Sequence, residues 1–322
     1  MKCYLTISVD VEPDCSSNWQ YSSPLQFEGV KKGIGERLQP LFDEYGQVPT
    51  YLINNVVLEN DATIDFFKKM QGKFELGTHL HPEFIAPQKE FFDYAGKSGR
   101  ANCCFYSPEI EREKIRNISS LFRTKFGFDP TSFRAGRFSA GANTIAALAE
   151  LGYKVDTSVT PHISWNDRTR EQPVDFTKAP EQPYFIRSGS ISEPDVAGRI
   201  LQVPVTIGLF KRHQVKEFVS SAGGLRRNMR SHKPVWLRPY YTSASRMKVL
   251  AEQFITKYAT NEIIVLNMMF HNVEVLPGIS PYTNSEKDCN RYLSQLKIFF
   301  SFCKARGIEG IGLSELYDVY RK

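Results

Sequence analysis

The sequence lacks several features that mark whole classes of protein. No apolar run reaches the roughly 20 residues that a transmembrane helix needs, which excludes a membrane-embedded protein. The chain runs from Met1 and Lys2 straight into an apolar stretch, so we expect no signal peptide and a cytoplasmic location. It also has no internal repeat, low-complexity tract or linker. We therefore expect a single domain over residues 1–322.

A large excess of either charge is also missing. Lys and Arg number 41 against 35 Asp and Glu, and 41% of the residues are hydrophobic, which is typical of a globular protein. The densest basic run, Arg226 to Arg230, is too short to predict nucleic-acid binding. Most of the charge is interpreted as solvated surface, although this run suits a phosphate-bearing substrate.

The six cysteines lack the spacing of a metal site. None of them form a C-x-x-C pair, which argues against a zinc–cysteine centre. Cys103 and Cys104 are adjacent, which suits neither a bridge between them nor a disulfide framework. Reduced thiols, and with them a cytoplasmic location, are the expectation.

What is present is a regular alternation of short apolar stretches with helical ones. Strands are expected at 3–9, 48–53, 74–78, 131–134, 155–157, 200–205, 235–237, 263–267 and 308–311, and helices at 33–45, 61–70, 108–126, 142–151, 244–258, 286–306 and 314–320. This rhythm predicts an α/β protein with a parallel sheet, and seven or eight such units favour a barrel. Two excursions, at about 82–107 and 160–199, interrupt it.

Polar side chains gather directly after the expected strands, where α/β proteins place functional residues. In chain order they are Asp10, Glu12, Asp14, His79, His81, Glu83, Arg134, Asp156, His271, Asn272 and Glu274. Arg238, which precedes Pro239, is a weaker candidate for the same mouth.

Two pairs in this set have a spacing that suits a metal. Asp10 and Glu12, like His79 and His81, are two residues apart, so on an extended segment each pair shares one face. Two imidazoles can converge on one cation, and a carboxylate can complete the set. Three protein ligands with open positions are typical of a catalytic metal, because water needs a place to bind.

Each of these residues alone also has an ordinary interpretation, as turn chemistry, core or surface. Their joint occurrence at the same ends of successive strands is what favours a functional site. The other histidines, His162, His213 and His232, match no such pattern. The three tryptophans, Trp19, Trp165 and Trp236, are expected to pack in the core or at the rim rather than floor a sugar site.

Four stretches resemble the motifs of the metal-dependent polysaccharide deacetylases, the NodB homology domain of proteins like carbohydrate esterase family 4. They are Thr6 to Glu12, Glu75 to Pro82, Phe133 to Arg137 and Met268 to Asn272. The resemblance covers the chain from Thr6 to about Leu313. It implies a distorted (β/α)7 barrel and is strongest to divergent members linked to surface-polysaccharide synthesis.

The resemblance also implies an activity and a role for each matched residue. The activity is hydrolysis of an N-acetyl or related acyl group from a sugar carried by a nucleotide, a lipid or an oligosaccharide, as in O-antigen or lipopolysaccharide synthesis. The implied roles are a base (Asp10), ligands of a divalent metal, expected to be Zn²⁺ (Glu12, His79 and His81), an acid for the leaving amine (His271) and a guanidinium that orients the base (Arg134).

The motifs depart from the family pattern in two places. The family's histidines are four apart, whereas here they are two apart and Glu83 holds the fourth position. The family's adjacent aspartates become Asp10-x-Glu12, and Asp14 is a further carboxylate nearby. Asp14 and Glu83 therefore stay open as alternative or additional ligands.

Two other classes of function compete with this interpretation. His81, Glu83 and His271 spell H-x-E…H, the facial triad of non-haem Fe(II) oxygenases, although such sites commonly lie on antiparallel barrels. The second competing class is a non-catalytic carbohydrate-binding protein on the deacetylase fold. The joint presence of Asp10, Arg134 and His271 speaks against it, because a binding protein needs neither base nor acid.

Overall fold

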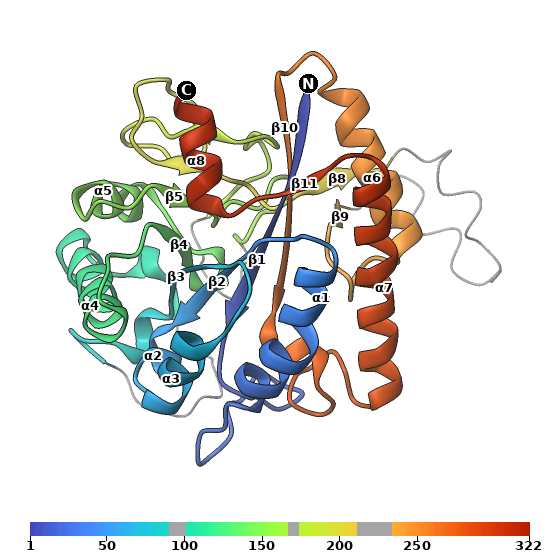
Figure 1. Cartoon of the computed structure of the whole chain (residues 1–322). Helices are drawn as coiled ribbons and strands as arrows, with labels where there is room; N and C mark the ends of the chain where they lie inside the picture. Colours follow the sequence, from blue (N-terminus) through green and yellow to red (C-terminus); the bar gives the residue numbers. More distant parts are fainter. Residues whose placement is uncertain (90–100, 167–173, 211–233) are drawn as a thin grey trace, which may run out of the picture.

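A parallel sheet of short strands forms the centre of the computed structural model, which describes residues 1–89, 101–166, 174–210 and 234–322 (Figure 1). Its strands are β1 (Lys2–Val11), β2 (Pro49–Asn54), β3 (Glu75–Leu80), β4 (Ser132–Ala135), β5 (Val155–Asp156), β6 (Tyr184–Phe185), β7 (Leu201–Gln202), β10 (Ile263–His271) and β11 (Glu309–Gly310). They lie in the order β10-β1-β2-β3-β4-β5-β7-β6, with β11 beside β1. Every pairing is parallel except that of β6 with β7.

The sheet curls, and hydrogen bonds outside the named strand pairings link the segment beyond β7 to β10. The backbone N–H of Thr206 donates to the carbonyl of Asn267 at 2.9 Å, and the Asn267 N–H donates to the Thr206 hydroxyl at 2.8 Å. The segment beyond β7 thus reaches across to β10. A separate antiparallel pair, β8 (Ile207–Leu209) and β9 (Pro234–Trp236), follows it. The predicted distorted barrel is confirmed in this curled form.

Helices cover the outer side of the sheet (Figure 1). They are η1, a π-helix (Gly29–Leu38), α1 (Gln39–Glu44), α2 (Asn55–Leu58), α3 (Asp61–Lys69), α4 (Pro108–Phe126), α5 (Ala142–Glu150), α6 (Ala244–Lys257), α7 (Glu286–Ala305) and α8 (Leu313–Arg321). Helix α4 begins and ends at residues whose types are typical of helix ends. The Ser107 side chain accepts a hydrogen bond from the Ile110 N–H, and Gly127, at φ 83°, ends the helix. None of the described helices has the length and apolar character needed to cross a membrane.

Strand β1 is buried on both faces, but the two faces differ in chemistry. Leu5, Ile7 and Val9 belong to the main hydrophobic core. The alternate residues carry polar side chains, and the Ser8 hydroxyl donates to the side-chain oxygen of Asn267 at 3.0 Å. Because side chains alternate along a strand, Asp10 and Glu12 continue the polar face of Ser8. The polar interior of the barrel therefore leads to the carboxyl end of the strands.

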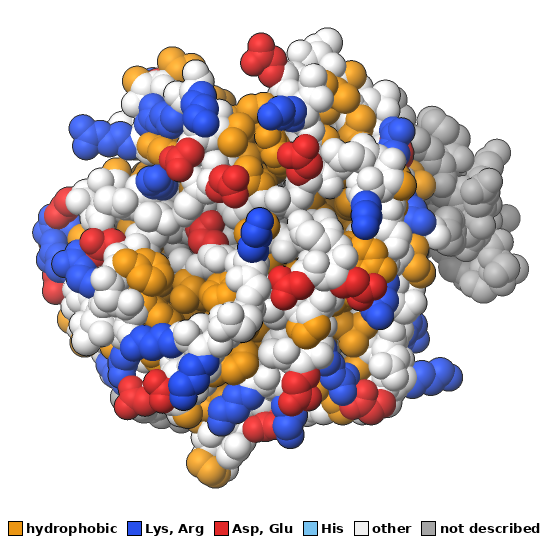
Figure 2. Space-filling model, in the orientation of Figure 1, with side chains coloured by type: hydrophobic (Ala, Val, Ile, Leu, Met, Phe, Trp, Pro, Cys, Tyr) orange, Lys and Arg blue, Asp and Glu red, His pale blue; other side chains and the backbone are white. Residues whose placement is uncertain are grey.

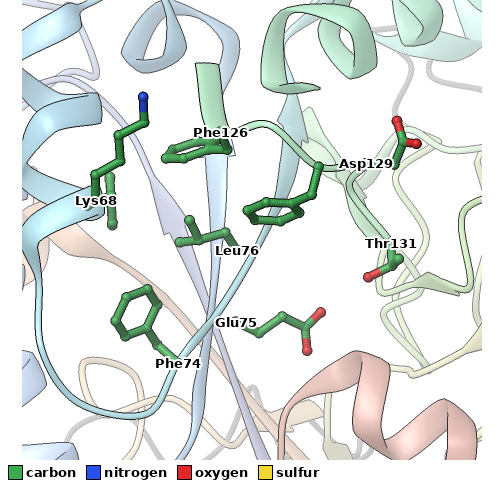
Figure 3. A pocket seen from close by; sticks show the side chains of 9 residues that line it. Lys68, Phe74, Glu75, Leu76, Phe126, Asp129 and Thr131 are labelled. Atoms are coloured by element: carbon green, nitrogen blue, oxygen red, sulfur yellow. The ribbon is translucent and has the colours of Figure 1, made fainter. Parts of the chain in front are cut away.

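A cavity of about 450 Å³ lies at the opposite, amino end of β3 and β4 (Figure 3). It is lined by Phe67, Lys68, Phe74, Glu75, Leu76, Phe126, Phe128, Asp129 and Thr131. The Glu75 carboxylate accepts hydrogen bonds from the Ser314 N–H at 2.8 Å and hydroxyl at 2.7 Å, and another from the Ser132 hydroxyl. The Glu75 carboxylate is thus bonded within the protein, and the cavity lies away from the carboxyl ends of the strands.

We expect Glu111→Gln to stabilise the protein more at pH 8 than at pH 5. Glu111 is buried on α4, where it accepts a hydrogen bond from the Thr144 hydroxyl, and burial raises its pKa to about 7. Its protonated form therefore stabilises the fold below the unfolded pKa of 4.5, and that contribution is lost as the pH rises through about 7. Glutamine carries no charge to bury, so we expect its gain in the free energy of unfolding to be about 2–3 kcal/mol larger at pH 8 than at pH 5. Urea unfolding at both pH values measures this, and equal gains at both would contradict it.

Candidate metal centre and active site

Three buried side chains at the carboxyl ends of β1 and β3 form a candidate metal centre. Glu12 follows β1, His79 lies near the end of β3, and His81 follows it. Glu12 Oε1 lies 3.2 Å from His79 Nε2 and 3.1 Å from His81 Nε2, and the two Nε2 atoms are 3.1 Å apart. Their ligand atoms therefore form a nearly equilateral triangle.

The chemistry of this triangle fits a divalent cation. His79 Nδ1 is 3.2 Å from the carbonyl oxygen of Arg134, which can only accept, so Nδ1 carries the proton and Nε2 presents a lone pair to the triangle. Burial lowers the pKa of His81, but the carboxylates of Glu12 and Glu83 outweigh it and raise that pKa to about 9. The site thus attracts positive charge. Ligand atoms of a tetrahedral zinc ion, each about 2.0–2.1 Å from it, lie about 3.3 Å apart, close to the observed edges.

Two further residues orient Glu12. The Tyr21 phenol donates to Glu12 Oε2 at 3.3 Å, so that Oε1 faces the histidines. Burial, with the Glu12 charge, raises the pKa of Tyr21 well above its usual range, which keeps the phenol a donor. The Asn272 side chain accepts from the Glu12 N–H at 2.8 Å and donates to the Glu12 carbonyl at 3.1 Å. The carboxylate is therefore held from both its side chain and its backbone.

The structure places the two alternative carboxylates away from the triangle. Asp14 accepts from the N–H groups of Glu28 at 2.9 Å and Gly29 at 2.8 Å, where η1 begins. Glu83 Oε1 is 2.8 Å from Arg137 Nη1 and 3.5 Å from Nδ1 of His81, on the far side of the imidazole from Nε2. Burial raises the pKa of Glu83, but Arg137 and His81 outweigh it and lower the pKa to about 2. Glu83 thus supports His81 as an outer partner.

The facial triad of an oxygenase is not assembled in the described part of the chain. There, the grouping with metal-ligating geometry consists of Glu12, His79 and His81, and it includes neither Glu83 nor His271.

Asp10 lies between the triangle and His271. Arg134 Nη1 donates to its Oδ1 at 2.6 Å, while its Oδ2 lies 4.0 Å from Nε2 of both His79 and His271. Burial would raise the pKa of Asp10, but Arg134, with the two histidines, outweighs it and lowers the pKa below its usual value. Arg134 is itself fully buried and also donates to the Ser8 hydroxyl at 2.6 Å. Asp10 is therefore an oriented, ionised carboxylate.

His271 is held by a carboxylate three residues further along the chain. Its Nδ1 lies 2.8 Å from Glu274 Oε1, and its backbone N–H donates to the same oxygen at 2.9 Å. Glu274 is ion-paired with Arg238 and accepts from the Tyr292 phenol at 3.1 Å. Burial would raise the pKa of Glu274, but Arg238 and His271 outweigh it and lower that pKa. Glu274 thus holds the Nδ1 side of the ring, which leaves Nε2 facing Asp10.

A strained turn after β4 packs against the candidate metal centre. Arg137 and Phe138 have φ angles of 54° and 55°, in the left-handed region that non-glycine residues rarely occupy. Gly136, just before them, lies against His81, and a Cβ there would come within 2.9 Å of His81 Cδ2. Only glycine allows this approach, so the turn fixes one side of the His81 ring.

The other candidates from the sequence have different surroundings. Arg238, the weaker candidate, does reach the site through Glu274. Asp156 accepts from the Ser158 hydroxyl at 2.6 Å and N–H at 3.0 Å, and so holds a turn after β5. His162 pairs with Glu181 at 2.7 Å, away from the triangle. His213, His232 and the basic run from Arg226 to Arg230 lie outside the described residues.

Sequence reasoning missed Tyr21 and Tyr292 and assigned Arg137 no role. Tyr21 and Tyr292 lie in a loop and on a helix face, where no period or spacing distinguishes them. Arg137 lies in the stretch from Phe133 to Arg137 that resembles a family motif, and this position was the one sequence signal for its role.

The surface in the orientation of Figure 1 carries Lys and Arg side chains interspersed with Asp and Glu (Figure 2). The charges of both signs are scattered over this face rather than gathered in one area.

Comparisons with known proteins identify the fold. No family model and no curated protein sequence matches the chain. A protein assigned as a polysaccharide deacetylase from Mycobacterium smegmatis has 14% identity and a TM-score of 0.53, with 100% of this chain and 91% of that chain covered. An allantoinase has 11% identity and a TM-score of 0.54, with 98% and 90% covered. A GH57 branching enzyme from Thermococcus kodakaraensis has 12% identity and a TM-score of 0.51, with 99% and 72% covered. The chain is thus similar in fold to a polysaccharide deacetylase, as the sequence resemblance predicts.

Proposed function

We propose that the protein is a metal-dependent hydrolase that removes an N-acetyl or related acyl group from a sugar. The observation that carries this proposal is the position of Asp10 Oδ2, which lies 4.0 Å from Nε2 of both His79 and His271. The residues proposed as metal ligand, base and acid thus lie around one point. Two imidazoles with one carboxylate form a ligand set found in catalytic zinc sites, so Zn²⁺ is the proposed ion.

The proposed reaction uses each of these groups once. A divalent ion held by Glu12, His79 and His81 would lower the pKa of a bound water toward about 7 and polarise the acyl carbonyl. Asp10, kept ionised by Arg134, takes a proton from the attacking water. His271, oriented by Glu274, donates a proton to the leaving nitrogen as the C–N bond breaks. The products are acetate and a free amine.

The setting of the reaction rests on the sequence resemblance. We propose a cytoplasmic enzyme of surface-polysaccharide synthesis, such as that of O-antigen, whose sugar is carried by a nucleotide, a lipid or an oligosaccharide. The resemblance to divergent deacetylases supports this setting.

The test is acetate release by the purified protein from N-acetylated nucleotide sugars, lipid-linked sugars and oligosaccharides. We expect bound metal near one per chain, equal yields of acetate and amine, loss of both with a chelator, and recovery with added Zn²⁺. Release that persists after complete removal of the metal would contradict the proposal. Chelator-insensitive sugar binding without acetate release would instead support the carbohydrate-binding alternative.

A further inference from the structure

We infer that an aromatic platform beside His271 binds the leaving half of the substrate, and that its occupant is an uncharged pyranose ring. The aromatic platform consists of Trp19, Tyr240, Tyr241 and Tyr282. The inference rests on the proposed function, because it takes His271 as the group that faces the leaving nitrogen.

The platform is continuous and begins at His271. The Trp19 ring lies 4.8 Å from the His271 ring and 5.5 Å from that of Tyr282, between ring centroids. Tyr282 in turn lies 4.5 Å from Tyr240 and 5.9 Å from Tyr241. Three loops, after β1, β9 and β10, supply these rings. Residues far apart in the sequence thus form one aromatic surface at the edge of the proposed active site.

This surface is exposed where core packing would bury it. The exposed fractions of Trp19, Tyr240 and Tyr241 are 36%, 45% and 49%. Trp19 also has a φ of 65°, a left-handed conformation that is strained for a bulky residue. Because neither exposure nor strain favours folding, we attribute the arrangement to binding.

The charge at the platform favours a neutral occupant. Arg238 lies against two of its rings, with Cζ 4.8 Å from the centroid of Tyr241 and 4.9 Å from that of Tyr282. It is only 3% exposed and is ion-paired with Glu274, so its charge is already balanced. The rings therefore offer apolar faces and phenol groups, which suit the C–H faces and hydroxyls of a sugar.

Position distinguishes a pyranose from another flat group such as a nucleobase. In the proposed substrate, the nitrogen that His271 faces is attached directly to a carbon of the ring. That ring must therefore lie next to His271, where Trp19 and Tyr282 are. A base joined through a diphosphate would lie beyond it.

The inference is tested by comparing two substrates. The metal-loaded protein and its Tyr240→Ala variant are assayed for acetate release from a methyl 2-acetamido-pyranoside and from the acyclic N-acetylethanolamine. Tyr240 contacts the platform but not His271 in the described contacts, so its loss should leave the acid in place. We divide kcat/KM for the pyranoside by kcat/KM for the acyclic amide. We expect this ratio to be about tenfold lower in Tyr240→Ala than in the wild type, because KM for the pyranoside rises. The control is Phe128→Ala, because Phe128 is an equally exposed aromatic residue at the far cavity.

The outcomes separate this inference from the proposed function. An unchanged ratio in Tyr240→Ala, or a wild-type enzyme without preference for the ring, overturns the platform while the hydrolase stands. If the wild type releases no acetate, calorimetric binding of the pyranoside decides. Binding that is weakened by Tyr240→Ala and not by Phe128→Ala supports the platform without the hydrolase. Equal binding by both variants, or none by the wild type, overturns it.

Discussion

Asp10→Asn is expected to retain the metal and to lose hydrolysis by about 10²–10⁴-fold in kcat. Asparagine has nearly the same shape and can still accept the hydrogen bond from Arg134, which lies 2.6 Å from Asp10 Oδ1. Its amide cannot take a proton from water. The effect is therefore expected in kcat rather than in metal content. Acetate release and metal analysis on the same preparation measure both.

Asp14→Asn is the matched control for this variant. Asp14 is also a buried carboxylate on the segment after β1. Unlike Asp10, it accepts hydrogen bonds from the backbone N–H groups of Glu28 and Gly29. Asparagine serves that capping role about as well as aspartate. We expect Asp14→Asn to keep its activity within a few fold. If Asp10→Asn were as active as this control, the assignment of Asp10 as the base would be wrong.

His79→Ala is expected to abolish stoichiometric metal binding without unfolding the protein. It removes one corner of a triangle whose edges are 3.1 to 3.2 Å and leaves Glu12 and His81 to hold the ion. We expect an affinity loss larger than the 10–100-fold that is typical of an outer partner. Tyr21→Phe, which deletes the phenol that donates to Glu12 Oε2, is expected to fall within that smaller range. Competition with a chromophoric chelator measures both affinities.

The control for His79→Ala is His162→Ala. His162 bonds Glu181 rather than the triangle, so its removal should leave the metal content unchanged. Circular dichroism confirms that each variant is folded. Full metal stoichiometry in His79→Ala would overturn the ligand assignment, whatever the activity.

Much of the fold can be predicted because it depends on local patterns. The period of two along β1 places Asp10 and Glu12 on one face, as the structure has them. Helix α4 runs over the predicted residues, Pro108–Phe126, because Ser107 and Gly127 are strong signals for its ends. The rule that parallel strands present their carboxyl ends together brings His79 and His271 to Asp10.

The rest depends on contacts between distant residues, which have no local pattern. The excursion at 160–199 contains β6, whose pairing with β7 involves strands of two residues each, too short to show a period. The barrel closes through hydrogen bonds between Thr206 and Asn267, which are 61 positions apart in the sequence. Tyr21 comes from an irregular loop, and its bond to Glu12 follows only from the folded path of that loop.

The pairing of Asn272 with the Glu12 backbone bears on how the protein is made. The two residues are 260 positions apart, and β1 lies between β2 and β10 in the sheet. During synthesis β1 leaves the ribosome first, but one of its edges has no partner until β10 has followed. An unpaired strand edge invites association with other chains, so a nascent chain depends on chaperones or slow collapse until then. The Glu12 backbone is accordingly fixed by Asn272 only after the two ends of the polypeptide have come together.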